Sequence, residues 1–154
     1  MVAIYISALV VANLLVAWLG PWFSPINAFF LIGLDLVVRD KLHERWQDKI
    51  WLRMFGLIAG AGLLSFMLNP ASGKIAVASV TAFVIAGAVD ALVYHYLRHK
   101  PWMIKSNASN ASGALVDSIV FPTIAFGSLM PFIVLLQVVA KILGGFMWSV
   151  VFRK

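Results

Sequence analysis

The sequence predicts an all-α integral membrane protein, a single domain over residues 1–154 with six transmembrane helices. Of its 154 residues, 62% are hydrophobic and 12% are charged, and the mean hydropathy is +0.96. Because a soluble domain carries roughly 45–50% apolar and 25% charged residues, this chain holds more apolar side chains than one compact core can bury. The composition excludes a water-soluble enzyme and indicates lipid as the main solvent. The absence of cysteine excludes disulfides and thiolate metal sites.

Six apolar stretches are long enough to cross a bilayer, which takes about 20 helical residues. The first ends at Gly20-Pro21, the second has Pro25 in its first turn, where proline costs no hydrogen bond, and the fifth contains Pro122. No basic segment precedes the first stretch, so we expect it to remain as a helix rather than act as a signal peptide. The predicted spans are residues 2–19, 22–38, 50–68, 75–97, 109–126 and 131–152.

The basic residues predict the orientation of these spans. With six spans, ten of the twelve Lys and Arg residues lie on one side, Lys74 lies on the other, and Lys141 lies within the sixth span. Short loops rich in Lys and Arg stay in the cytoplasm, so we expect both termini to be cytoplasmic in a bacterial-type inner (plasma) membrane. The net charge of +6 is then explained by topology and by attraction to anionic lipid, and no nucleic-acid partner is predicted.

The longest polar segment, RDKLHERWQDKIWLR at residues 39–53, predicts an amphipathic helix over about 39–49. Acids and bases alternate along it, while Leu42, Trp46 and Ile50 recur every four residues. Such a helix lies in the membrane interface with its apolar stripe toward the acyl chains. A surface for docking a partner protein is the alternative.

Three carboxylates and one ammonium group are predicted inside the bilayer: Asp35, Asp90, Asp117 and Lys141. A charge there costs at least about 2.5–3.5 kcal/mol, so such residues usually face a bundle interior and serve a function. All four are expected near the midplane or in the cytoplasmic half, as one buried polar cluster. Structural alternatives remain open: Asp35 snorkels to the interface or pairs with Arg39, and Asp90 pairs with Lys141 or a nearby hydroxyl.

Amides and hydroxyls lead toward Asp117 along the start of the fifth span, at Ser106, Asn107, Ser109, Asn110 and Ser112. Helix capping is the alternative use of these residues. Gly56 and Gly60 form a G-x-x-x-G pattern that predicts close helix packing, within the monomer rather than across a dimer. No P-loop and no convincing metal-ligand set occurs, so no cofactor and no enzyme activity are predicted.

Several of these residues together resemble one family. The run Asp35-Leu-Val-Val-Arg39 is similar to its Asp-Leu-x-x-Arg signature, and Lys141 matches a lysine of its last helix. The stretch from Ser106 to Ser118, followed by Phe121 and Phe126, is similar to its fifth helix. The chain thus resembles the queuosine-precursor transporter family, also called the vitamin uptake transporter (VUT) family, over most of its length.

The resemblance implies a compact six-helix bundle similar to the substrate-binding subunits of energy-coupling-factor importers. It also implies import of a 7-deazaguanine: 7-cyano-7-deazaguanine, its aminomethyl form or queuine. A carboxylate can accept the ring N–H and the exocyclic amine of such a base, and an amide or ammonium group can donate to its carbonyl. The short outer loops and the insert after Arg39 depart from longer members of the family and leave the substrate within this class open.

The residues expected to bind this purine-like substrate are Asp117, Asn107, Asn110, Ser118, Lys141, Phe121 and Asp90. Phe126, Phe29, Phe30 or Trp148 are further candidates for an aromatic face against the ring. Asp35 and Arg39 are expected to form a gating or structural pair. The alternative function is a substrate-binding subunit of a larger importer or a non-transporting assembly module. A homodimer and an energising partner both remain open.

Overall fold

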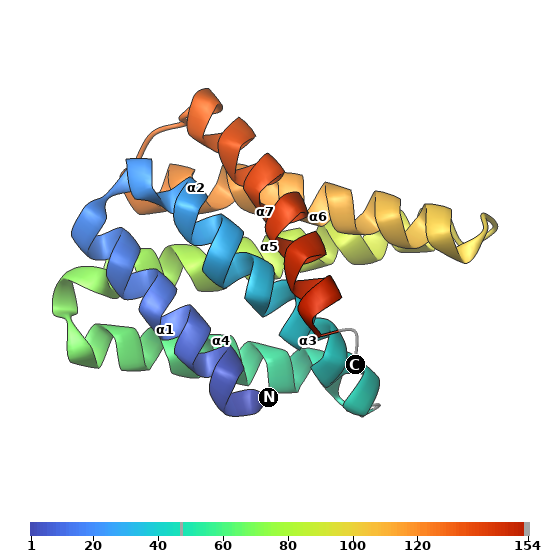
Figure 1. Ribbon diagram of the computed structural model, residues 1–154, viewed down its shortest axis with the longest axis horizontal. Coiled ribbons are helices and arrows are strands. Elements are labelled where there is room, and N and C mark those ends of the chain that lie inside the picture. The colour runs from blue at the N-terminus through green and yellow to red at the C-terminus, as the bar shows by residue number, and fades with distance from the viewer. Residues whose placement is uncertain (47, 153–154) are drawn as a thin grey trace.

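The computed structural model describes residues 1–46 and 48–152, with all of their side chains except those of Asp40, His43, Glu44, Ile50, Trp102, Met103, Lys105, Ser106 and Asn107. The described chain is helical, without strands. The elements are α1 (Val2–Leu19), η1 (Pro21–Phe23), α2 (Ser24–Asn27), η2 (Ala28–Ile32), α3 (Gly33–Arg45), α4 (Ile50–Leu68), η3 (Pro70–Ser72), α5 (Gly73–Tyr96), α6 (Trp102–Phe126) and α7 (Pro131–Val151). Helix α4 packs against α1 and α5, and the second pass packs against α1 and α7 (Figure 1).

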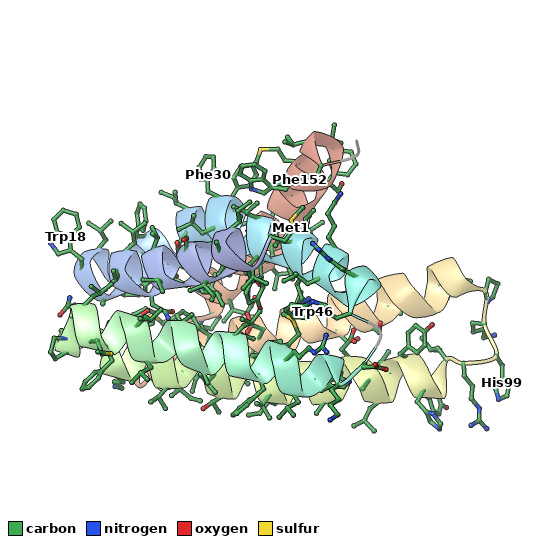
Figure 2. The ribbon with its side chains drawn as sticks, turned by 90° about the horizontal axis from the view of Figure 1, so that it is seen from below. Met1, Trp18, Phe30, Trp46, His99 and Phe152 are labelled. Carbon is green, nitrogen blue, oxygen red and sulfur yellow. The ribbon has the colours of Figure 1, made fainter. Side chains whose placement is uncertain are left out.

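The outside of the bundle is apolar, as expected for a protein in lipid. Large side chains point outward all along the helices, among them Trp18, Met67 and Phe146, each at least 70% exposed (Figure 2). Soluble monomers rarely expose apolar patches larger than a few hundred Å². Within the described residues, five segments are long and apolar enough to cross a membrane: Val2–Leu19, Pro21–Arg39, Trp51–Leu68, Pro70–Tyr96 and Pro131–Val151.

The fifth predicted span, residues 109–126, falls within α6, which is not among those five segments. The serines, asparagines and Asp117 lower the hydropathy of this helix. It nevertheless packs along α5 over most of its length. A sixth membrane crossing therefore remains a prediction, while the all-helical membrane fold is confirmed.

The second pass is one continuous helical segment with a π turn, η2, inside it. It continues to Arg45 at the end of α3, and Trp46 is extended. The separate interfacial helix predicted over 39–49 is therefore not found. Nothing between Val38 and Arg39 breaks a helix, and Leu42 is buried in a core with Tyr5 and Met54 rather than turned toward acyl chains.

The α5–α6 hairpin extends beyond the other helices, as both views show. At 1.5 Å per residue, its helices are about 36–38 Å long, against about 27 Å for α1. Helix α6 begins at Trp102 with Pro101 as its N-cap, seven residues before the predicted start at 109. The residues from Ser106 to Ser112 thus lie inside the helix, and the capping interpretation is wrong.

Polar contacts join the helices within the core. Asn13 of α1 donates to Ser65 of α4 at 3.2 Å and accepts from Ser79 of α5 at 3.0 Å. Gln137 of α7 donates to Ser24 of α2 at 2.8 Å. In lipid, where unpaired polar groups are costly, such bonds fix how the helices pack against each other.

Helix α7 crosses the second pass with backbone close to backbone. A Cβ atom built on Gly144 would lie 2.0 Å from the carbonyl oxygen of Phe29, and one on Gly33 would lie 2.6 Å from the carbonyl carbon of Gly144. Trp148 donates to the carbonyl of Phe30 at 2.8 Å, one helical turn further along. Glycine at these positions is what allows α7 to lie against the π turn.

Gly56 and Gly60 of α4 do not make the close packing that their spacing predicts. No atom lies within 4 Å of a Cβ atom built on either residue. The prediction that they pack within the monomer is therefore wrong, because α4 turns this side of the helix outward.

The basic residues gather at one end of the bundle. The start of α1, the ends of α3 and α7 and the tip of the α5–α6 hairpin lie there, while Lys74 lies at the start of α5, at the opposite end (Figure 1). This arrangement agrees with the predicted placement of the termini on one side of the membrane, which remains a prediction.

Gly144→Ala is expected to destabilise the fold by about 1–3 kcal/mol, because the added methyl overlaps the Phe29 carbonyl. Gly145→Ala is the matched control, since its Cβ atom would lie at an ordinary 3.9 Å from Leu36. Thermal unfolding of both variants in detergent checks this. Equal melting temperatures for the two variants would show that the close crossing is not required.

Candidate functional site

The buried ammonium group of Lys141 is the centre of the candidate site. Lys141 lies midway along α7 and is only 4% exposed. An unpaired charge in such a place is strongly unfavourable, so it needs partners on a neighbouring helix. The next helix in space, α6, supplies them.

Two consecutive residues of α6 accept hydrogen bonds from Lys141. Its Nζ forms a salt bridge with Asp117 Oδ2 and donates to Ser118 Oγ at 2.7 Å. Ser118 is fully buried, whereas the Asp117 side chain is 30% exposed. The pair is therefore buried on the lysine side and open on the carboxylate side.

This contact leaves hydrogen-bonding capacity unused. An ammonium group has three donors, and among the described residues Asp117 and Ser118 take two of them. A carboxylate offers about four acceptor positions, and Lys141 uses one on Oδ2. The site thus presents acceptors on Asp117 next to a remaining donor on Lys141.

Asp90 faces α6 one helical turn from Asp117. A Cβ atom built on Gly113 would lie 3.4 Å from Asp90 Cβ and 3.9 Å from its Oδ1. Oδ1 is buried and has no hydrogen-bond partner among the described residues. The structural alternative, an Asp90–Lys141 pair, is wrong, because Lys141 contacts Asp117 instead.

Asp35 lies in a different environment from the Asp117–Lys141 pair. It is buried on α3, and the phenol of Tyr5 from α1 lies within electrostatic range of both Asp35 and Arg39. Both of these residues make interactions within the protein. The expected gating or structural role for Asp35 and Arg39 remains a prediction.

The other predicted contacts are spread along the bundle. Asn110 is exposed on α6 toward the hairpin tip, and the side chain of Asn107 lies outside the described residues. Phe121, one turn after Asp117, packs against the cluster of Val16, Ile75, Ala78 and Ala125. Its ring contacts Phe126 edge-on, with centroids 6.3 Å apart.

The remaining aromatic candidates lie where α7 crosses the second pass. Phe29 and Phe30 contact each other edge-on at 4.9 Å, and Trp148 bonds the Phe30 carbonyl. Of the aromatic candidates, Phe121 lies nearest in sequence to the Asp117–Lys141 pair, one turn after Asp117.

Two neutral residues of the buried polar network, Asn13 and Gln137, were missed in the sequence. Both are at most 4% exposed. A single amide within an apolar span is a usable signal, because polar side chains there join helices. Gln137 is also one turn before Lys141, on the same side of α7. In the described part of the chain, no group of three or more His, Asp or Glu side chains could hold a metal ion.

Lys141→Met is expected to destabilise the protein by on the order of 3 kcal/mol, because it leaves the Asp117 carboxylate without its partner. Adding Asp117→Asn should recover more than half of this loss, since the unpaired charge is then removed. Chemical unfolding of both single variants and the double variant forms a double-mutant cycle. Additive losses would contradict an energetically coupled pair.

Comparisons with known proteins support a membrane transporter. The chain is 26% identical over 120 residues to a "Probable queuosine precursor transporter" from Haemophilus influenzae. That alignment covers 68% of this chain and 51% of the relative, so the chain spans about half the length of the curated relative it matches. No solved structure matches the chain.

A family match covers almost the whole sequence. Residues 1–153 match the family described as "Putative vitamin uptake transporter". This is a family of transporters and not of enzymes, as the sequence predicts. The chain is thus a multi-pass membrane protein that belongs to the vitamin uptake transporter family.

Proposed function

We propose that this chain imports a 7-deazaguanine queuosine precursor across the bacterial inner membrane. The observation that carries the proposal is the contact of Lys141 with Asp117 and Ser118. Family membership and the name of the relative from Haemophilus influenzae supply the substrate class.

The hydrogen-bonding pattern of the pair complements one edge of the base. Along that edge a 7-deazaguanine carries the exocyclic amine, the ring N–H and the carbonyl, which is the order donor, donor, acceptor. Asp117 offers two carboxylate oxygens to the donors, and the neighbouring Lys141 offers its remaining N–H to the carbonyl. The adjacency of a carboxylate and an ammonium group is what this order requires.

Asp90, Asn110 and Phe121 complete the proposed site. The buried Oδ1 of Asp90 lies against α6 one turn from Asp117 and needs a donor. Phe121, one turn away on the other side, supplies a flat apolar surface for the ring. Asn110 and Asn107 lie further along α6, toward the basic end from which a cytoplasmic product would leave.

A second function, the substrate-binding subunit of a larger importer, is favoured by the projecting α5–α6 hairpin. Its tip extends beyond the bundle and exposes Tyr96. Uptake of labelled 7-cyano-7-deazaguanine by cells that express only this chain separates the two functions. Uptake supports a complete transporter, while binding without uptake supports the subunit.

Asp117→Asn is expected to weaken the binding of 7-cyano-7-deazaguanine by roughly 10–150-fold, which corresponds to the loss of about 1.5–3 kcal/mol for hydrogen bonds to a charged group. Equilibrium binding to the purified chain in nanodiscs measures this. Asp48→Asn is the control, because this exposed carboxylate lies in the α3–α4 connection. Wild-type affinity in a folded Asp117→Asn variant would refute the assignment.

The ligand itself offers a second test. A 7-cyano-2,6-diamino-7-deazapurine has an amine where 7-deazaguanine has its carbonyl, and its N1 carries no hydrogen. It therefore presents a donor to the Lys141 ammonium and an acceptor to the Asp117 carboxylate. We expect wild-type protein to bind it at least tenfold more weakly, because a buried donor then lacks its acceptor. Competition against labelled 7-cyano-7-deazaguanine in the same nanodiscs gives the ratio. Equal competition would show that Asp117 and Lys141 do not bind this edge of the base.

A further inference from the structure

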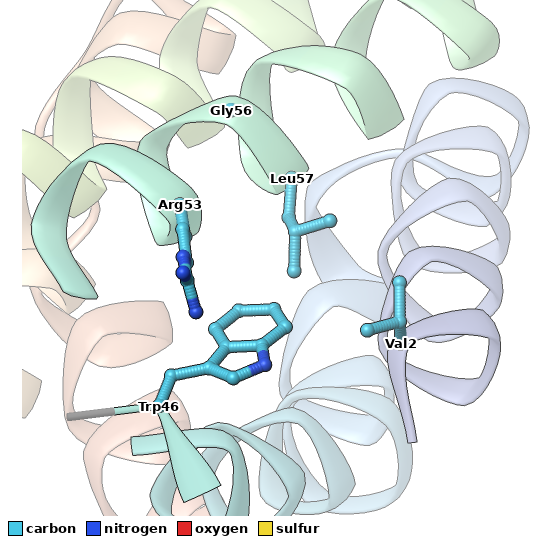
Figure 3. A pocket seen from close by; sticks show the side chains of 5 residues that line it. All are labelled: Val2, Trp46, Arg53, Gly56 and Leu57. Atoms are coloured by element: carbon cyan, nitrogen blue, oxygen red, sulfur yellow. The ribbon is translucent and has the colours of Figure 1, made fainter. Parts of the chain in front are cut away.

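An open hollow lies at the basic end of the bundle, away from the Asp117–Lys141 pair. It has a volume of about 510 Å³ and is lined by Val2 of α1, Trp46 after α3, and Arg53, Gly56 and Leu57 of α4 (Figure 3). Its walls are apolar apart from the guanidinium of Arg53 and the indole N–H of Trp46. It therefore differs in chemistry from the proposed substrate site.

Two local features form the hollow. Trp46 leaves the helix in an extended conformation, with φ −106° and ψ 94°, and its indole faces Arg53, whose guanidinium lies 5.5 Å from the ring centroid. Gly56 lies about one helical turn after Arg53 on α4. No atom lies within 4 Å of a Cβ atom built on it. The missing side chain leaves room between Trp46, Leu57 and Val2, as Figure 3 shows.

Basic residues lie next in sequence to those that line the hollow. Arg45 precedes Trp46 directly, and Lys49 is the N-cap of α4, one turn before Arg53. Arg45, Lys49 and Arg53 are all exposed, as is Asp48, the described acid of the connection. The same end of the bundle holds most of the basic residues, which the positive-inside rule places beside the anionic headgroups of the cytoplasmic leaflet.

We propose that this hollow binds one anionic phospholipid. Its acyl chain would lie over Gly56 against Leu57 and Val2, and its phosphate would be held by Arg53 with Lys49 at the rim. Charge complementarity selects this occupant: the apolar floor suits a hydrocarbon chain and the basic rim suits a phosphate diester. A 7-deazaguanine does not suit it, because no lining side chain can accept from the base's two donors.

The test uses the full chain purified in detergent, with phosphatidylglycerol or phosphatidylcholine added. Native mass spectrometry counts the bound lipids, and thermal unfolding measures stabilisation. We expect phosphatidylglycerol to bind at least tenfold more tightly than phosphatidylcholine and to raise the melting temperature more. Arg53→Gln should remove this preference. Lys74→Gln, the same charge change at the opposite end of the bundle, should keep it.

Side chains that fill the hollow provide a second, independent test of lipid binding. Gly56→Leu should block phosphatidylglycerol binding although Arg53 is retained, and Gly56→Ala, a milder change that is compatible with folding, should weaken it. Equal binding of the two lipids would overturn the proposal. So would displacement of the lipid by inorganic phosphate alone, because the acyl chain would then contribute nothing. A change from dimer to monomer in Gly56→Leu with lipid binding intact would assign the face to a second copy of the chain and also overturn it.

Discussion

A lysine buried midway along an apolar helix has to find a carboxylate or hydroxyl partner, and the arrangement of the last two helices follows from this need. Lys141 meets Asp117 and Ser118 on α6, which sets the register of α6 against α7. Helix α7 is also held by the Gln137–Ser24 bond and by the crossing at Gly144 and Phe29. The charged pair thus links the α5–α6 hairpin to the second pass through a single helix.

The neutral polar groups follow the same rule of pairing in lipid. Asn13 bonds both Ser65 and Ser79, so one amide fixes α1, α4 and α5 relative to one another. Ser65 also donates to the carbonyl of Ala61 in its own helix. Asn27 and Asp90 depart from the rule, because the buried Oδ1 of each lacks a partner among the described residues. An unsatisfied acceptor beside a paired site is what a binding site for a donor-rich ligand would show.

The sequence predicted the helices well because hydropathy and helix-ending signals act locally. The predicted spans 2–19 and 50–68 coincide with α1 and α4, and Pro131 marks the start of α7. It also singled out Asp117 and Lys141, since charges in apolar spans are conspicuous. The sequence could not predict contacts that depend on neighbours in space. Lys141 pairs with Asp117 rather than Asp90, Leu42 faces the core, and Gly56 faces outward. Helical periodicity shows that a stripe exists, but not which neighbour it faces.

The position of the pair also suggests how binding and movement are connected. Helix α6 packs along α5 over most of its length but meets α7 over a shorter stretch, while α7 packs against η2 and α3. Asp117 and Lys141 therefore lie where two packing units, the α5–α6 hairpin and the second pass with α7, are joined. A ligand that donates hydrogen bonds to Asp117 and accepts one from Lys141 would contact both units at once. Its binding free energy would then differ between arrangements of the two units. Differential affinity of this kind is what a ligand needs to shift a conformational equilibrium.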